Sequence, residues 1–280
     1  MNTYFKTTKR METIRKITFL TVLIMTSIIS GFAEKTAVPR IKEENVSYTI
    51  GKKVFKGYVA YDENKKGKRP AVLIVHEWWG LTDYPKMRAR QLAKLGYIAF
   101  AVDMFGDGKT AANPTEAQAM TGPFYADPQL AKTELEAALI KLKQFKETDP
   151  ANIFAIGYCF GGSVVLNAAK LGLDLKGVVS FHGGLKGVPA DKKLLKANIL
   201  VCHGGSDKFV SEDDIRIFKH QLDSIKADYQ FIVYPNAVHA YSNPAATELG
   251  KKFNMPIEYN QKADIDSWND MKSFFKSLIK

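Results

Sequence analysis

The sequence predicts a single α/β domain built on a mostly parallel β-sheet. Apolar runs rich in β-branched residues recur along the 280-residue chain, and stretches with helical spacing separate most of them. Uninterrupted runs of this kind suit strands buried on both faces of a sheet, and alternation with helices favours parallel neighbours. Two short alternating segments before the first run predict an antiparallel hairpin. The sheet should therefore begin antiparallel and continue parallel, with helices on both faces.

The individual elements follow from the pattern in chain order. The hairpin should join residues 46–50 to residues 54–61 around Gly51-Lys52-Lys53. The apolar runs predict strands at residues 71–75, 97–102, 153–156, 178–181, 199–202 and 231–234. Amphipathic spacing and capping signals predict helices at residues 85–95, 130–145, 161–171, 211–227 and 265–279. In sheets of this kind, functional sites form at the carboxyl ends of the strands.

The first 33 residues have the pattern of a secretory signal peptide. Basic residues precede an apolar run at residues 17–29, and Ser30-Gly31-Phe32-Ala33 follows with small residues where signal peptidase needs them. We expect cleavage after Ala33, because the run is short for a spanning helix; an uncleaved anchor is the alternative. The mature protein would be secreted or periplasmic without a stable membrane anchor. Residues 34–45 would form a loose charged leader before a domain of residues 46–280.

The composition is that of an ordinary globular protein, with 46% hydrophobic and 25% charged residues. The formal net charge is +11, but the lysines are spread along the chain, which predicts a solvated basic surface rather than a nucleic-acid groove. Cys159 lies in a glycine-rich turn and Cys202 in an apolar strand, so no disulfide is expected. His76, His182 and His203 lack metal-ligand spacing and are expected to be strand-end hydrogen-bonding residues.

A nucleophile motif stands between the strand at 153–156 and the helix after it. Gly157-Tyr158-Cys159-Phe160-Gly161-Gly162 matches the strand–turn–helix elbow G-x-S-x-G of α/β-hydrolases, with cysteine in place of serine. The turn would present the sulfur at the carboxyl edge of the sheet, where the helix N-terminus favours thiolate. Taken alone, the motif also fits a tight turn with a buried structural thiol.

The partners of such a nucleophile occur in the expected order along the chain. Asp207 and His239 each follow a predicted strand, so both should lie at the same sheet edge as Cys159. His239 would deprotonate Cys159, and Asp207 would orient the imidazole. The backbone N–H groups of Trp78 and Phe160 are the expected oxyanion hole. Spacing alone does not decide whether the neighbouring Glu77 is catalytic or a salt-bridged surface residue.

Together these motifs resemble the dienelactone hydrolase family, from about residue 46 to the C-terminus. The resemblance rests on residues 157–162, on Gly204-Gly205-Ser206-Asp207-Lys208-Phe209-Val210 and on the segment ending at His239, with 76–81 and 103–108 similar to a common variant. It implies a single α/β-hydrolase domain, no cofactor or metal, and a Cys-His-Asp triad that cleaves a small ester or lactone through an acyl-enzyme. It also implies a role for Glu77, because the matching glutamate contacts the cysteine and helps generate thiolate when substrate arrives.

The chain departs from the family's namesake in its charges. The namesake binds a substrate carboxylate with two arginines; one would fall shortly after His239, where this chain reads Ala240-Tyr241-Ser242-Asn243. The other would follow Asp103, where Lys109 is the only cation before Tyr125, so an anionic dienelactone is not expected. An apolar pocket is expected instead, and core packing is the equal alternative for its candidate aromatic residues: Trp78, Trp79, Phe105, Phe124, Tyr125 and Tyr241.

Two alternatives to ester or lactone hydrolysis stay open at this point. The same triad could cleave thioesters or amides, since the nucleophile and base do not distinguish them. The fold could also serve as a non-catalytic binding module, although no triad or oxyanion position is lost. A small-molecule substrate and a monomer are the expected partner and state.

Overall fold

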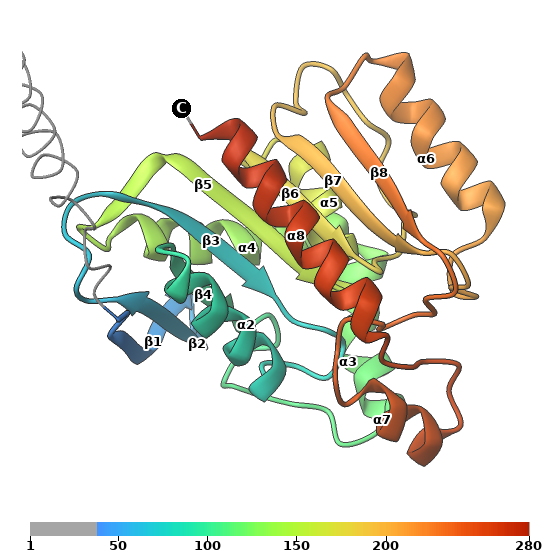
Figure 1. Ribbon diagram of the computed structural model, residues 1–280, viewed down its shortest axis with the longest axis horizontal. Helices are drawn as coiled ribbons and strands as arrows, with labels where there is room; N and C mark the ends of the chain where they lie inside the picture. The colour runs from blue at the N-terminus through green and yellow to red at the C-terminus, as the bar shows by residue number, and fades with distance from the viewer. Residues whose placement is uncertain (1–37, 280) are drawn as a thin grey trace, which may run out of the picture. The chain divides into compact units, whose positions relative to one another are not determined.

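The strands of the computed structural model, which describes residues 38–279, form one eight-stranded sheet in the order β1-β2-β4-β3-β5-β6-β7-β8 (Figure 1). The pairs β1–β2 and β2–β4 are antiparallel, and all other neighbours are parallel. This confirms the predicted antiparallel start and parallel continuation. The strands are β1 (Ile41–Ile50), β2 (Lys53–Asp62), β3 (Arg69–Val75), β4 (Ile98–Val102), β5 (Thr148–Tyr158), β6 (Gly177–Phe181), β7 (Asn198–Gly204) and β8 (Tyr229–Tyr234).

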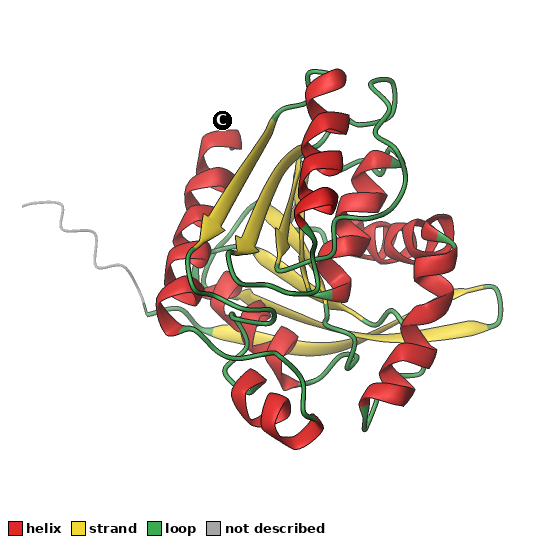
Figure 2. Ribbon diagram, turned by 90° about the vertical axis from the view of Figure 1, so that its right-hand side faces the viewer, coloured by secondary structure: helices red, strands yellow, loops and turns green. Residues whose placement is uncertain are grey.

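Helices cover both faces of this sheet (Figure 2). On one face, α2 (Asp83–Lys94) and α8 (Gln261–Leu278) pack with the inner strands. The other face carries α4 (Pro128–Lys143), α5 (Phe160–Lys170) and α6 (Glu212–Ser224). Two further helices, α3 (Pro114–Ala126) and α7 (Ala246–Phe253), lie beyond the arrowheads of the strands, at the end where the site was expected (Figure 1).

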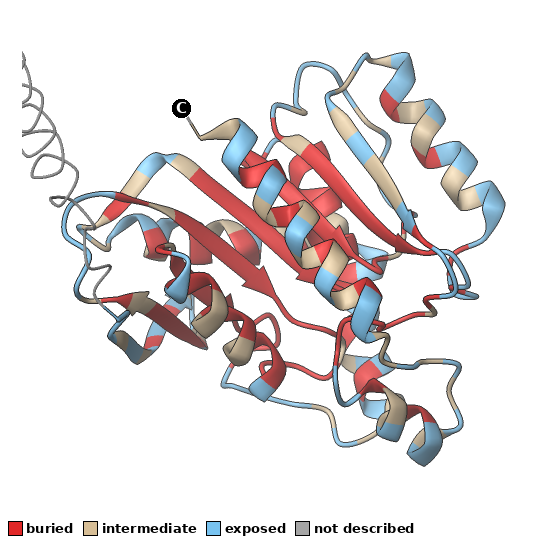
Figure 3. Cartoon of the chain, viewed as in Figure 1, coloured by how far each residue is buried: buried red, intermediate tan, exposed pale blue. Residues whose placement is uncertain are grey.

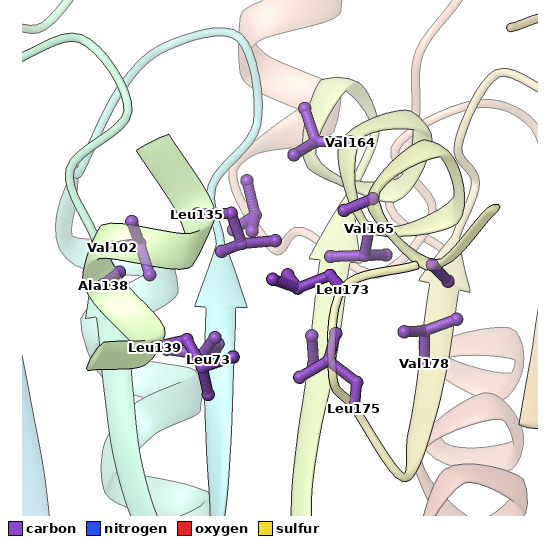
Figure 4. Packing of buried hydrophobic residues seen from close by; sticks show 14 of the residues in the cluster. Leu73, Val102, Leu135, Ala138, Leu139, Val164, Val165, Leu173, Leu175 and Val178 are labelled. Carbon is purple, nitrogen blue, oxygen red and sulfur yellow. The ribbon is translucent and has the colours of Figure 1, made fainter. Parts of the chain in front are cut away.

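Alternation along β3 divides the core into two layers. Leu73 and Val75 pack with the α4 and α5 side, whereas Val72 and Ile74 pack with the α2 and α8 side. Figure 4 shows Leu73 beside Leu139 of α4, with Val164 and Val165 of α5 farther along the same layer. All four residues are fully buried, and burying such a side chain is worth about 1.5–3 kcal/mol. Figure 3 shows the same pattern across the sheet, with buried central strands under helices that are exposed on their outer sides.

The first strand begins earlier than the sequence predicted. Residues 41–45, expected in the loose leader, form the first half of β1 and pair with residues 58–62 of β2. Glu43 and Glu44 accept hydrogen bonds from Tyr58 and Tyr61 of the partner strand, at 2.5 and 2.6 Å. Their charges hid the strand from a hydrophobicity pattern, but an edge strand tolerates charges because one side faces solvent.

Two expectations about the N-terminus concern residues outside the described range. The signal peptide of residues 1–33 and its cleavage after Ala33 lie there entirely, and so does most of the remaining leader. Within residues 38–279, none of the helices combines the length and hydrophobicity that crossing a bilayer requires.

Helices α3 and α7 were not predicted. Asn113 caps the N-terminus of α3 by accepting a hydrogen bond from the backbone N–H of Glu116, and Pro114 occupies the first turn. That capping signature is readable in the sequence. The body of the helix hides it, because Gly122 and Pro123 interrupt helical spacing and few of its residues are buried.

Candidate active site

Cys159 sits in a strained turn between β5 and α5. Its backbone has φ 52° and ψ −113°, a region that a residue with a side chain rarely adopts and that costs about 1–3 kcal/mol. The flanking glycines make the turn possible. A Cβ at Gly157 would lie 2.0 Å from the carbonyl oxygen of Gly161, and one at Gly161 would lie 2.3 Å from that of Val75. The turn has the strand–turn–helix form of the predicted elbow.

The backbone of Cys159 is tied to the end of β6. Its N–H donates to the carbonyl oxygen of Phe181 at 3.0 Å and to Nδ1 of His182 at 3.1 Å. Nε2 of His182 lies 2.7 Å from Oγ of Ser242. Burial and the nearby His239 hold the pKa of His182 well below its usual value, so the ring is neutral, with its proton on Nε2. His182 therefore has the strand-end hydrogen-bonding role expected of it.

The structure brings Cys159, His239 and Asp207 into one hydrogen-bonded row. Nε2 of His239 lies 2.9 Å from Sγ of Cys159, and its Nδ1 lies 2.8 Å from Oδ2 of Asp207. The imidazole and carboxylate are buried, whereas the thiol is partly accessible. Burial opposes protonation of His239, but the adjacent sulfur and Asp207 outweigh it and raise the pKa of His239 to about 10. The arrangement favours a protonated imidazole between the sulfur of Cys159 and the carboxyl group of Asp207.

Two backbone N–H groups beside Cys159 have no acceptor in the part of the chain that the structure describes. Phe160 is the first residue of α5, so its N–H has no intrahelical partner. Trp78 lies in the turn after β3, which is closed by a hydrogen bond from the N–H of Gly80 to the carbonyl of Glu77. Trp78 also lines the cavity that holds Cys159. These are the two amides that the sequence assigned to an oxyanion hole.

Glu77 lies in the same cavity, although its carboxylate bonds elsewhere. Nδ2 of Asn243 donates to Oε2 of Glu77 at 2.6 Å, and this is the side-chain hydrogen bond that holds it in the described structure. Burial raises the pKa of Glu77 to about 7, against smaller opposing effects from Asn243 and His239. The contact with cysteine implied by the resemblance is therefore replaced here by a contact with Asn243.

The cavity at Cys159 has a volume of about 600 Å³ and mostly apolar walls. Trp79 and Tyr125 line it, as expected, and Trp79 stacks on Phe253 of α7 at 5.6 Å. Phe105 and Tyr241 do not line it, and their assignment to the pocket was wrong. Phe105 packs between His76, Phe124 and Phe160, whereas Tyr241 is fully buried. The Tyr241 hydroxyl donates to the carbonyl of Cys202, so the side chain points into the core. Tyr241 therefore does not line the cavity, although it lies only two residues after His239.

Free positive charge is scarce in this cavity. Among the described residues that line it, Lys186 is the one lysine or arginine, and its Nζ lies 3.7 Å from Oδ1 of Asp214. Lys109, the cation noted in the sequence, is exposed and lies 3.9 Å from Asp107. Within residues 38–279, no group of three or more His, Cys, Asp or Glu side chains is arranged to hold a metal ion.

Several contributors to the site were not found from the sequence. Phe209 places its ring 4.7 Å from that of His239, and Asn243 holds Glu77. Gln118 and Thr121 reach the cavity from α3, and Met255 reaches it from beyond α7. Phe209 stood in a quoted motif and could have been proposed. Asn243 stood in a quoted segment too, but its partner could not be read from spacing, and the residues of α3 and Met255 depend on where the two unpredicted helices lie.

Comparison with known proteins agrees with this geometry. The model of the dienelactone hydrolase family matches residues 55–279. Protein usf of Aquifex pyrophilus is 28% identical over 230 residues, covering 80% of this chain and 94% of that protein. A protein of Aquifex aeolicus that is provisionally named a carboxymethylenebutenolidase is also 28% identical, over 231 residues, with the same coverage.

Solved structures agree as well. A dienelactone hydrolase-like promiscuous phosphotriesterase from metagenomic libraries superposes with a TM-score of 0.81 at 33% identity, covering 86% of this chain and 99% of that one. A second structure, described as m3DLH, gives a TM-score of 0.80 at 32% identity and the same coverage. The chain therefore belongs to the dienelactone hydrolase family and is a carboxylic ester or lactone hydrolase.

Proposed function

We propose that this hydrolase cleaves a small, uncharged ester or lactone through a covalent thioester on Cys159. The observation that carries the proposal is the row in which Nε2 of His239 lies 2.9 Å from Sγ and Nδ1 lies 2.8 Å from Asp207. An imidazolium held by Asp207 stabilises the thiolate, which is the nucleophilic form of cysteine. The N-terminus of α5 adds to that stabilisation, because the helix dipole favours negative charge there.

In the acylation step, the thiolate attacks the substrate carbonyl and a C–S bond forms. The carbonyl oxygen takes the negative charge and accepts hydrogen bonds from the N–H groups of Trp78 and Phe160. His239 gives its Nε2 proton to the leaving alkoxide as the C–O bond breaks. In deacylation, neutral His239 takes a proton from water, and the hydroxide displaces the thiolate and releases the acid.

Glu77 is proposed as a proton acceptor for the thiol. Its pKa of about 7 places it where a general base works best at neutral pH. A substrate entering the cavity would displace the carboxylate from Asn243, and Glu77 could then take the proton of a neutral Cys159. Such a thiol would resist oxidation better than a permanent thiolate.

Neutral substrates are favoured by the charges at the cavity. Arginine is the side chain suited to bidentate carboxylate recognition, and the one lysine among the described lining residues is paired with Asp214. The same feature favours a second candidate reaction, hydrolysis of neutral phosphate triesters, which a structural relative performs according to its description. Thioesters and amides stay as further substrates that the same row of residues could attack.

A single assay set tests the proposal. The chain from residue 34 is incubated with p-nitrophenyl acetate, a simple lactone, a matched thioester and diethyl p-nitrophenyl phosphate, alongside Cys159→Ala, Cys159→Ser and His239→Asn. Loss of one catalytic residue should lower kcat/KM by about 10³ or more. Acid-quenched mass spectrometry should show one acyl group on Cys159. Ester turnover that survives in Cys159→Ala, or a wild type that binds esters without cleaving them, would contradict the mechanism.

A further inference from the structure

A second cavity lies beside the one that holds Cys159. Its volume is about 260 Å³, and it lies where the junction of α3 and α4 meets α5 and the loop at Lys186 and Gly187. Tyr125, Ser163 and Lys186 line both cavities, so the two spaces share a wall. Ser163 is four residues after Cys159 on α5, one helical turn away. The second cavity therefore opens beside the nucleophile.

The free surface of this side cavity is apolar. Its walls come from Phe124 of α3, Ala131 of α4, and Phe160 and Val164 of α5, all of which are buried. The ring of Phe124 packs against that of Phe160 at 5.6 Å, which fixes one wall. An apolar space without polar partners holds water poorly and favours apolar ligands.

The polar residues at its edge are already engaged. Oγ of Ser163 donates to the carbonyl of Gly184 at 3.0 Å. Nδ2 of Asn167 donates to the carbonyl of Ser163 at 3.0 Å, and its Oδ1 accepts from the N–H of Val188 at 2.9 Å. The side chain of Lys186 is 83% exposed and its ammonium group pairs with Asp214. The buried polar groups of Ser163 and Asn167 are thus already hydrogen-bonded within the protein.

Tyr125 forms the partition between the two cavities. It is 57% exposed, and its ring stands edge-on to Phe160 at 5.7 Å. It lies near the C-terminal end of α3, two residues after Pro123, and Asp127 ends α3 and caps α4. Its hydroxyl also hydrogen-bonds with the side chain of Ser163, which lines both cavities, so the ring stands where a ligand would pass from the main cavity into the side cavity.

We propose that the side cavity is a substrate subsite for an apolar group, about the size of a phenyl ring or a short alkyl chain, with Tyr125 as the residue that controls entry. A cavity of about 150 Å³ lined by aliphatic and aromatic side chains binds benzene, so the space here is sufficient. The substrate class is then an uncharged ester or lactone that carries such a group. This inference rests on the proposed function, because it places the group relative to the acyl bond that Cys159 attacks.

Two substitutions test the subsite by changing its volume in opposite directions. Ala131→Phe fills the side cavity from α4, and Tyr125→Ala removes the partition. Ala137→Phe, on the same helix but outside both cavities, is the matched control. Each is assayed with p-nitrophenyl acetate, butyrate, hexanoate and phenylacetate, and with acetates of alkyl alcohols of increasing length.

In the wild type, each methylene that enters the subsite should raise kcat/KM about fourfold, until the cavity is full. Ala131→Phe should abolish this gain, so that kcat/KM no longer rises with chain length. Tyr125→Ala should extend the gain to longer chains, and Ala137→Phe should match the wild type. A chain-length profile that neither cavity variant alters would overturn the subsite.

A readout without turnover separates this inference from the proposed reaction. Methyl, butyl and benzyl methanethiosulfonates form a disulfide with an accessible cysteine whether or not the protein is an esterase, and Cys159 is the accessible thiol of the two. The butyl and benzyl reagents should label the wild type faster than the methyl reagent, and Ala131→Phe should remove that preference. If no ester is hydrolysed but the preference is present, the proposed function fails and the subsite stands. If esters are hydrolysed and the preference is absent, the subsite fails alone.

Discussion

Replacing Glu77 with glutamine should stabilise the protein at neutral and alkaline pH while lowering its activity. The carboxyl group is fully buried, and burial raises its pKa from an ordinary 4.5 to about 7. The difference between these two values corresponds to about 3 kcal/mol of folding free energy. Glutamine keeps the shape and the acceptor oxygen that Asn243 contacts, but it cannot ionise.

The sign follows from proton linkage. Because the folded pKa is raised, the unfolded chain releases the proton of Glu77 first, between pH 4.5 and about 7, and stability falls over that window. Below pH 4.5 the acid is protonated in both states, so wild type and Glu77→Gln should have the same free energy of unfolding. Above pH 7 the variant should be more stable by about 3 kcal/mol.

Urea unfolding at pH 4, 5, 6, 7 and 8, followed by tryptophan fluorescence and fitted with a shared m-value, measures this difference. The control is Glu248→Gln, which makes the same chemical change at an exposed glutamate on α7. Asn243→Asp would not serve as a control, because it adds a charge. The control should show no trend with pH. A Glu77→Gln stability difference that is the same at every pH would refute the raised pKa and the proton-acceptor role with it. The variant's pH–rate profile should also lose its inflection near 7.

Three other perturbations test the framework around the site. Cys159→Gly should be more stable than the equally inactive Cys159→Ala by about 1 kcal/mol in urea unfolding, because glycine accepts φ 52° without strain; equal stability would contradict the strained elbow. Arg88→Met should destabilise the protein by removing the cationic partner of the partly buried Asp264, and Asp264→Leu in the same chain should recover part of the loss; no recovery would argue against a stabilising ion pair. Iodoacetamide should label Cys159 alone in the folded protein, since burial raises the pKa of Cys202 to about 12, and mass spectrometry of tryptic peptides checks this.

The inner strands that the sequence predicted are strongly buried on both faces. Each of the apolar runs became a strand within a few residues of its expected bounds, and for the inner strands the reason is that two helical layers leave no room for polar side chains. β8 was found as well, although it is an edge strand with partly exposed residues. The predicted start of β1 was wrong because this strand lies at the sheet edge, where burial is weak. At the sheet edge, Glu43 and Glu44 are satisfied by tyrosines of β2, and no periodicity in hydrophobicity records such pairs.

The reactive residues were predictable because topology aligns them. Cys159, Asp207 and His239 each follow a strand, and parallel strands end at one edge, so sequence position alone brought them together. The pocket was not predictable in the same way. Whether Tyr125 lines a cavity and Tyr241 fills the core depends on side-chain direction and on α3, whose residues Gly122 and Pro123 obscure the helical pattern.

The segment after His239 has other tasks in this chain than the arginine expected there from the namesake of the dienelactone hydrolase family. Ser242 turns inward and bridges Nε2 of His182 and the hydroxyl of Tyr84, at 2.7 and 2.8 Å. Asn243 turns inward as well and holds Glu77. An arginine in this stretch would have to displace one of these contacts or leave a buried polar group unpaired, which costs about 1–3 kcal/mol. Ser242 and Asn243 are thus used to fix the elbow and the buried acid.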